Sequence, residues 1–158
     1  LGQMQRAFEL MIEYSLQREV YGSTLSEKQT VQNWIADSYV EIQASRALTL
    51  NAAKKIDQGD EARVEISAIK FFGAKVLHDV IDRAIQVHGA RGVSGDTPLE
   101  GMYRNARGAR IYDGPDESHR ACGSLGKQLA RLRNHLIYGD VAAGRGSGEG
   151  LGTVLTRG

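Results

Sequence analysis

Apolar residues recur at the spacing of an α-helix over three long segments, and this periodicity constrains the fold more than any other feature of the sequence. The first segment covers residues 2–17, where Ala7 and Tyr14 border the apolar stripe. The stripe itself consists of Met4, Phe8, Met11 and Ser15. No strand-like alternation of useful length occurs along the chain. We therefore expect an all-α fold.

The second and third segments are longer than the first. The second runs from about residue 26 to 57, and its stripe consists of Val31, Ile35, Tyr39, Ile42, Leu50, Ala53 and Ile56. The third ends near His88, and its stripe consists of Ile66, Ile69, Gly73, Val76, Val80, Ala84 and Val87, widened by Ala68, Phe72 and Leu77. Two apolar faces on the third segment indicate burial against two neighbours. Ser26 and Asp60 are the expected N-caps of the two helices.

The connections between these segments predict an antiparallel arrangement. A glycine-rich loop is expected from Gly89 to Pro98, where a short helix begins and runs to about Gly108. Pro115 is expected to open a last helix that ends near Leu136. Long antiparallel helices of this kind form an up-down four-helix bundle, here with a short extra helix. We expect the bundle to occupy residues 1–138 and a Gly-rich flexible tail to occupy residues 139–158.

Composition sets limits on partners and cofactors. The chain has 158 residues, a formal net charge of +1 and one cysteine, Cys122, so it cannot form an internal disulfide. The small net charge predicts no broad attraction to nucleic acid or membranes. No apolar run approaches the ~20 residues of a membrane span, and the four histidines lack metal-ligand spacing. The chain begins at Leu1 inside an amphipathic pattern, so we expect it to be part of a longer protein.

The segment from Ile111 to Glu117 carries the strongest candidate for chemistry. Gly114 and Pro115 end any helix that arrives from upstream, and Pro115 suits the first position of a new one. Asp113 is therefore predicted to lie on a tight turn at a helix start, where backbone geometry places its carboxylate. Such a carboxylate can act as a general base in a site that excludes water. The alternative is an Asx-type turn that only separates two helices.

Three sequence blocks resemble those of acyl-CoA dehydrogenases, in order and spacing. Residues 111–117, Ile-Tyr-Asp-Gly-Pro-Asp-Glu, resemble the catalytic turn, which usually reads Tyr-Glu-Gly-Thr followed by a polar residue. Residues 17–22, followed by Gln29, resemble the Arg-x-x-Phe-Gly…Gln flavin signature. Residues 84–93, with Pro98 and residues 103–107, resemble the Gln-x-x-Gly-Gly-x-Gly…Pro…Arg-Asp-Ala-Arg block. The resemblance covers roughly residues 1–135, and the Asp-Gly-Pro-Asp-Glu form is similar to the multidomain members with a kinase-like domain.

The resemblance implies FAD as cofactor and assigns residues to it. Arg18 would bind the FAD pyrophosphate, with Val20, Tyr21 and Gln29 against the cofactor. Gln86, Gly89 and Ala90 would contact the adenosine-diphosphate half across a dimer interface, and Pro115 and Glu117 stand where the family has Thr and Gln on the adenosine side. Without the resemblance, Arg18 is a solvated cation at a helix C-terminus and Gly89 is a helix C-cap. Arg104, Arg107 and Arg110 form a solvated basic face or lie near CoA phosphates.

The resemblance also implies a reaction. Asp113 would remove the α-proton of an acyl-CoA thioester while a β-hydride leaves to the flavin, with Tyr112 and Gly114 at the substrate. An Asp carboxylate reaches about 1.5 Å less far than the family's usual Glu, and such a displacement can cost on the order of a hundredfold in rate. A glutamate upstream of the first helix is therefore an alternative base. The implied partners are the acyl-CoA substrate, an electron-transfer flavoprotein and further copies of the chain in a homodimer or homotetramer.

Two rival functions remain open from the sequence. A flavin oxidase of the nitroalkane-oxidase type resembles this family and uses an aspartate base. A non-catalytic helical oligomerisation module would use the bundle only to assemble subunits. The implied location is the cytoplasm of a bacterium, or the mitochondrion or peroxisome of a eukaryote.

Overall fold

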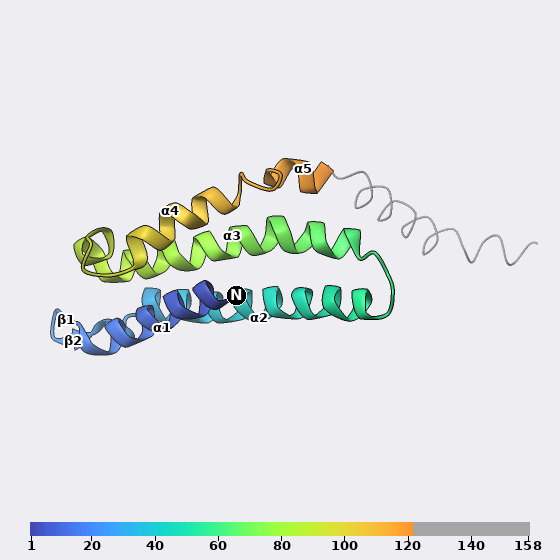
Figure 1. Cartoon of the computed structure of the whole chain (residues 1–158). Helices are drawn as coiled ribbons and strands as arrows, with labels where there is room; N and C mark the ends of the chain where they lie inside the picture. Colours follow the sequence, from blue (N-terminus) through green and yellow to red (C-terminus); the bar gives the residue numbers. More distant parts are fainter. Residues whose placement is uncertain (122–158) are drawn as a thin grey trace, which may run out of the picture. The chain divides into compact units, whose positions relative to one another are not determined.

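The computed structural model describes residues 1–121, and the fold of this part is all-α, as expected. Three long helices make up its body: α1 (Gly2–Gln17), α2 (Gln29–Asp57) and α3 (Arg63–His88). They run antiparallel in sequence order, and α1 lies beside only one half of the length of α2 and α3 (Figure 1). The shorter α4 (Leu99–Ala109) returns along α3 and leads to α5 (Asp116–Ala121).

The buried face of α1 is the stripe that the sequence predicts. Met4, Ala7, Phe8, Met11 and Ser15 are its buried residues. The polar Ser15 is tolerated there because its hydroxyl donates a hydrogen bond of 2.8 Å to the Ile12 carbonyl, which satisfies its polar group inside the core.

The connection from α1 to α2 is more structured than a simple turn. Two short antiparallel strands, β1 (Glu19–Val20) and β2 (Ser23–Thr24), flank a two-residue turn, and a 3-10 helix, η1 (Leu25–Glu27), follows. Both turn residues, Tyr21 and Gly22, have positive φ, as a tight hairpin requires. The prediction of Ser26 as N-cap is wrong. Ser26 lies inside η1, and the Glu27 carboxylate instead accepts hydrogen bonds from the Thr24 N–H and hydroxyl.

The buried face of α2 differs from the predicted stripe. Its buried residues are Val31, Ser38, Ile42, Ser45 and Ala52, whereas Tyr39, Leu50 and Ile56 are exposed. Three of the five buried side chains are small, and small side chains at a helix contact permit close approach of the partner helix. An ion pair joins the partly buried edge of this contact: Arg83 on α3 donates to both carboxylate oxygens of Glu41, at 2.7 and 3.2 Å.

Helix α3 is the central element, and it contacts α1, α2, α4 and α5. This bears out the prediction that it is buried against more than one neighbour. Its predicted cap is wrong, because α3 begins at Arg63 after Ala62, whose φ of 46° is left-handed, and no side chain caps the helix. Asp60 lies too far upstream for that role.

The predicted loop after α3 contains a 3-10 helix, η2 (Gly89–Val93), and α4 begins at Leu99, directly after Pro98. The last helix begins at Asp116 rather than Pro115, and its predicted end at Leu136 lies outside the described residues. The proposed boundary at residues 138 and 139 also lies outside them. Within residues 1–121, no helix is long and apolar enough to cross a membrane, and no cluster of His, Cys, Asp and Glu could hold a metal ion.

Candidate active site

The turn between α4 and α5 carries Asp113 on an unusual backbone. Asp113 has a φ of 54° and Gly114 a φ of 93°. Two successive left-handed residues reverse the chain sharply, and Asp is among the few side chains that adopt this conformation readily. Asp113 is exposed, and neither its carboxylate nor its N–H has a hydrogen-bond partner among residues 1–121. Both groups are therefore available to a ligand.

The base of this turn is closed by Arg110 and Asp116. The Arg110 Nε donates to the Asp116 carboxylate at 2.7 Å, and the Asp116 N–H donates to the Arg110 carbonyl at 3.2 Å. Asp116 is only 3% exposed. The hydrogen bond to Asp116 raises the pKa of Arg110 above its ordinary value, so this guanidinium is firmly charged. Arg110 is thus committed to the turn and is not part of a solvated basic face.

His119 contacts the apex of the turn from α5. Its Nε2 lies 3.0 Å from the Asp113 carbonyl oxygen. The ring also lies against Gly114, because a Cβ added there would stand 2.9 Å from Nε2. His119 therefore contacts the two left-handed residues together.

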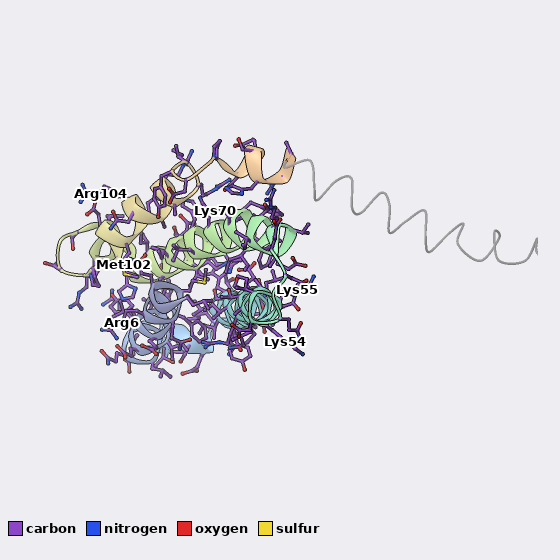
Figure 2. All side chains as sticks on the ribbon, turned by 45° about the vertical axis from the view of Figure 1, so that its right-hand side comes forward. Arg6, Lys54, Lys55, Lys70, Met102 and Arg104 are labelled. Carbon is purple, nitrogen blue, oxygen red and sulfur yellow. The ribbon has the colours of Figure 1, made fainter. Side chains whose placement is uncertain are left out.

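Lys70 fixes the end of α4 that leads into the turn. It lies on α3 on the side that faces α4 and α5 (Figure 2). Its ammonium donates to the Ala109 carbonyl at 2.6 Å and lies 5.2 Å from the centre of the Tyr112 ring. A cation at a helix C-terminus satisfies its free carbonyls, and the Tyr112 face attracts it further.

Tyr112 and Lys70 also line one end of an apolar groove of about 410 Å³. The groove extends over α2 and α3 toward the start of α1. Its other lining residues are Leu1, Met4, Ser45, Leu48, Thr49, Ile69, Phe72, Gly73, Ala74, Leu77 and Ala109.

The residues predicted to bind the cofactor fall into two groups. Arg18, Val20, Tyr21 and Gln29 lie at the connection of α1 and α2, and Gln86, Gly89 and Ala90 lie at the end of α3. Both locations are at the same end of the bundle (Figure 1), where Tyr14 of α1 stacks on His88 of α3 with ring centres 4.3 Å apart. Pro115 lies instead on the turn beside Asp113, and Glu117 lies in the first turn of α5. Helix α4, with its 11 residues, separates the two groups by about 16 Å of helix length.

At the end of the bundle that carries Arg18 and Gly89, the exposed guanidinium of Arg18 suits an anionic cofactor. Arg18 is exposed and has no ion-pair partner among residues 1–121. Gly89 has a φ of 60° and open space where a side chain would stand, so a ligand can approach its backbone. Gln86, by contrast, lines a polar pocket of about 290 Å³ with Asp79 and Asp82. Trp34 and Arg83, whose guanidinium is paired with Glu41, also line it, so the pocket presents charges of both signs.

His88 is buried at this end of the bundle. Its Nδ1 lies 2.8 Å from the Ala84 carbonyl, which can only accept, so Nδ1 carries a proton. Burial lowers the pKa of His88. Gly92 packs against the same turn of α3, because an added Cβ would lie 2.7 Å from the Ile85 carbonyl oxygen and 3.1 Å from the His88 Cβ. Only a glycine fits there without movement of the η2 backbone.

Sequence reasoning missed the residues that support the turn. The sequence pattern places Arg110 on a solvated basic face or near CoA phosphates, and it indicates no supporting role for Asp116, Lys70 or His119. Lys70 lies next to the apolar stripe of α3, but a lysine there can lay its stem on apolar surface and keep its ammonium in water, so its position alone does not indicate a partner. The roles of Asp113, Tyr112 and the cofactor residues stay predictions.

Comparison with known proteins defines the class. The family model "Acyl-CoA dehydrogenase, C-terminal domain" matches residues 1–124, so the chain belongs to that family. Over 121 residues it is 49% identical to "Probable acyl-CoA dehydrogenase FadE2" of Mycobacterium tuberculosis, covering 75% of this chain and 30% of that protein. It is 45% identical to "Acyl-CoA dehydrogenase family member 11" of Rattus norvegicus, covering 75% of this chain and 16% of that protein.

The fold agrees with the same class. Butyryl-CoA dehydrogenase from Megasphaera elsdenii superposes with a TM-score of 0.76 at 29% identity, covering 82% of this chain and 33% of that one. The chain therefore spans a third or less of the length of these relatives.

Proposed function

We propose that this domain completes the active site of an FAD-dependent enzyme that dehydrogenates an acyl-CoA thioester between its α and β carbons, with Asp113 as the base. The observation that carries the proposal is the state of Asp113. Its carboxylate and its N–H have no hydrogen-bond partner among residues 1–121. The backbone of the turn is nevertheless held, by the hydrogen bonds between Arg110 and Asp116 and by the contact of His119 with the Asp113 carbonyl. A free base on a restrained backbone is the arrangement that proton abstraction requires.

The protein groups would act in a concerted removal of two hydrogens. The Asp113 carboxylate takes the α-proton, and its N–H donates to the thioester carbonyl oxygen, where negative charge develops. Bound FAD would supply the acceptor for the β-hydride. Arg18 would hold the FAD pyrophosphate and Gly89 would offer its backbone beside it. The product is the α,β-unsaturated thioester, and bound FAD would supply the site that accepts the two electrons.

The separation of the two groups supports assembly from several subunits. The end of the bundle that carries Arg18 and the Asp113 turn lie at opposite ends of α4. Arg18 of one subunit can therefore bind a flavin that accepts hydride from the substrate at Asp113 of another subunit. We propose a homodimer or homotetramer and an electron-transfer flavoprotein as acceptor. The proposed location is the cytoplasm for a bacterial source, or the mitochondrion or peroxisome for a eukaryotic one. Membership of the subgroup with a kinase-like domain is part of this proposal.

The test is Asp113→Asn in the intact enzyme. The amide is nearly isosteric but cannot accept the α-proton at neutral pH, so the enzyme should keep its flavin and lose flavin reduction. Anaerobic stopped-flow bleaching with butyryl-, octanoyl- and palmitoyl-CoA measures this directly. Ser118→Ala, an exposed neighbour on α5, is the matched control and should bleach at the parent rate.

Each other outcome points to a stated alternative. Bleaching of Asp113→Asn near the parent rate means that another group, such as a glutamate upstream of α1, is the base. Reduction of the parent flavin by a nitroalkane but not by thioesters, followed by rapid reoxidation by oxygen, favours the oxidase. Purified intact protein without flavin absorbance favours a purely structural module.

A further inference from the structure

We propose that His119 is the positioning residue of the site: its ring N–H holds the Asp113 carbonyl and so fixes the left-handed backbone that aims the base. The inference rests on the proposed role of Asp113, and it assigns His119 no contact with substrate. The role belongs to a side chain on α5 that lies six residues beyond the base.

The chemistry of the contact defines which atom carries the proton. A carbonyl oxygen can only accept, so the 3.0 Å contact requires a proton on Nε2 of His119. The neutral ring must then be the Nε2–H tautomer, and the imidazolium keeps the same N–H.

The turn needs such a restraint. A non-glycine residue at a φ of 54° is in a sparsely populated region of backbone conformation, and even Asp, which enters it more readily than most residues, also populates right-handed and extended backbone. Asp113 is exposed, so packing does not hold it. His119 meets both sides of the peptide that joins Asp113 to Gly114, with a hydrogen bond to the carbonyl and ring contact at the glycine Cα.

His119 is itself anchored, so the restraint reaches back to the core. The guanidinium of Arg120, the next residue, lies 5.0 Å from the centre of the Phe71 ring on α3. At the start of α5, Asp116 is buried and bound to Arg110. Helix α5 is thus attached to α3 and α4 on either side of His119, and the imidazole transmits that rigidity to the turn.

The experiment uses the intact enzyme and distinguishes the effect of the His119 N–H donor from the effect of ring packing against Gly114. His119→Phe keeps a ring against Gly114 but removes the donor, whereas His119→Gln places an amide N–H near the position of Nε2. Both variants are compared with the parent and with Ser118→Ala. The readouts are the flavin reduction rate, the thioester dissociation constant from the same stopped-flow series, and crystal structures of the turn.

We expect His119→Phe to reduce flavin at least about tenfold more slowly, since a displacement near 1 Å costs on the order of a hundredfold. Flavin content should change little, and the thioester dissociation constant should rise much less than the rate falls, because the Asp113 N–H acts mainly on the charge that develops during the reaction. His119→Gln should recover most of the rate, and Ser118→Ala should match the parent. A purely structural role would lower flavin content or thioester binding in parallel with the rate, and Gln would not rescue it.

Two outcomes would overturn the inference: an unchanged reduction rate in His119→Phe, or a crystal structure of that variant with Asp113 still at its left-handed φ. The structural readout stands even if the parent reduces none of the three thioesters, a result that defeats the proposed function alone. If His119→Phe does not fold, an inactive His119→Gln with retained flavin would equally contradict the inference, because the amide keeps the donor.

Discussion

Arg110 and Asp116 are bonded to each other twice, once through their side chains at 2.7 Å and once through the Asp116 N–H and the Arg110 carbonyl at 3.2 Å. These bonds enclose residues 111–115 in a loop of fixed circumference. The buried Asp116 is therefore structural, and it is unsuitable as a neutral comparison for Asp113.

Asp116→Ala should destabilise the domain by about 2 kcal/mol, because it leaves the Arg110 guanidinium near the core without its partner. The Arg110 side chain is 32% exposed and Asp116 4%, so the loss is smaller than for a fully buried pair. Urea unfolding followed by circular dichroism measures the change. Glu100→Ala breaks the pair with Arg104, whose side chain is 75% exposed, and should cost about 0.5 kcal/mol or less. Equal losses in the two variants would contradict a special role for Asp116.

Gly92→Ala should destabilise the domain by about 1–3 kcal/mol, the usual cost of an oversized group in a packed site. The added methyl meets the backbone of Ile85, which cannot move without the last turn of α3. Thermal unfolding gives the stability, and flavin absorbance of the intact enzyme reports the loop that carries Gly89 and Ala90. Gly95→Ala, with open space around its Cα, is the control. If it lowers the melting temperature as much as Gly92→Ala, the contact with Ile85 is not the cause.

His88 should make stability depend on pH. Burial lowers the pKa of His88 from its ordinary value of 6.5, so the unfolded chain binds the proton more tightly than the folded chain. The free energy of unfolding should therefore be highest above about pH 6.5 and fall as the pH drops through the lowered pKa of the folded state. His88→Phe keeps a ring against Tyr14 and removes this titration. Unfolding curves between pH 5 and 8 should show a shallower slope for the variant, and parallel slopes would contradict the assignment.

The sequence predicts those parts of the fold where local pattern and burial agree. The face of α1 follows directly from its periodicity, including the buried Ser15. The face of α2 does not, because Ser38 and Ser45 are buried at a close helix contact, while Tyr39 and Leu50 are large and exposed. Hydrophobicity alone assigns those four positions in the opposite sense.

The candidate site shows the same division. The turn at Asp113 is predictable because Gly114 and Pro115 act on the chain next to them. Its supports are not, since Lys70 and Ala109 are 39 residues apart and meet only after α3 and α4 have packed. Arg110 and Asp116 do not share a helix face either, and only the reversal of the chain between them brings them together.

The length of helix α4 fixes both the distance and the relative rotation between the glycine loop at its start and the Asp113 turn at its end. A loop of similar length could absorb an inserted residue, but a helix cannot: one extra residue turns everything beyond it by about 100° and shifts it by 1.5 Å. An insertion in α4 would carry Ala109 away from Lys70 and rotate Asp113 to another side of the bundle. The length of this 11-residue helix is therefore as much a part of the site as any side chain, and substitutions along α4 should be tolerated where insertions and deletions are not.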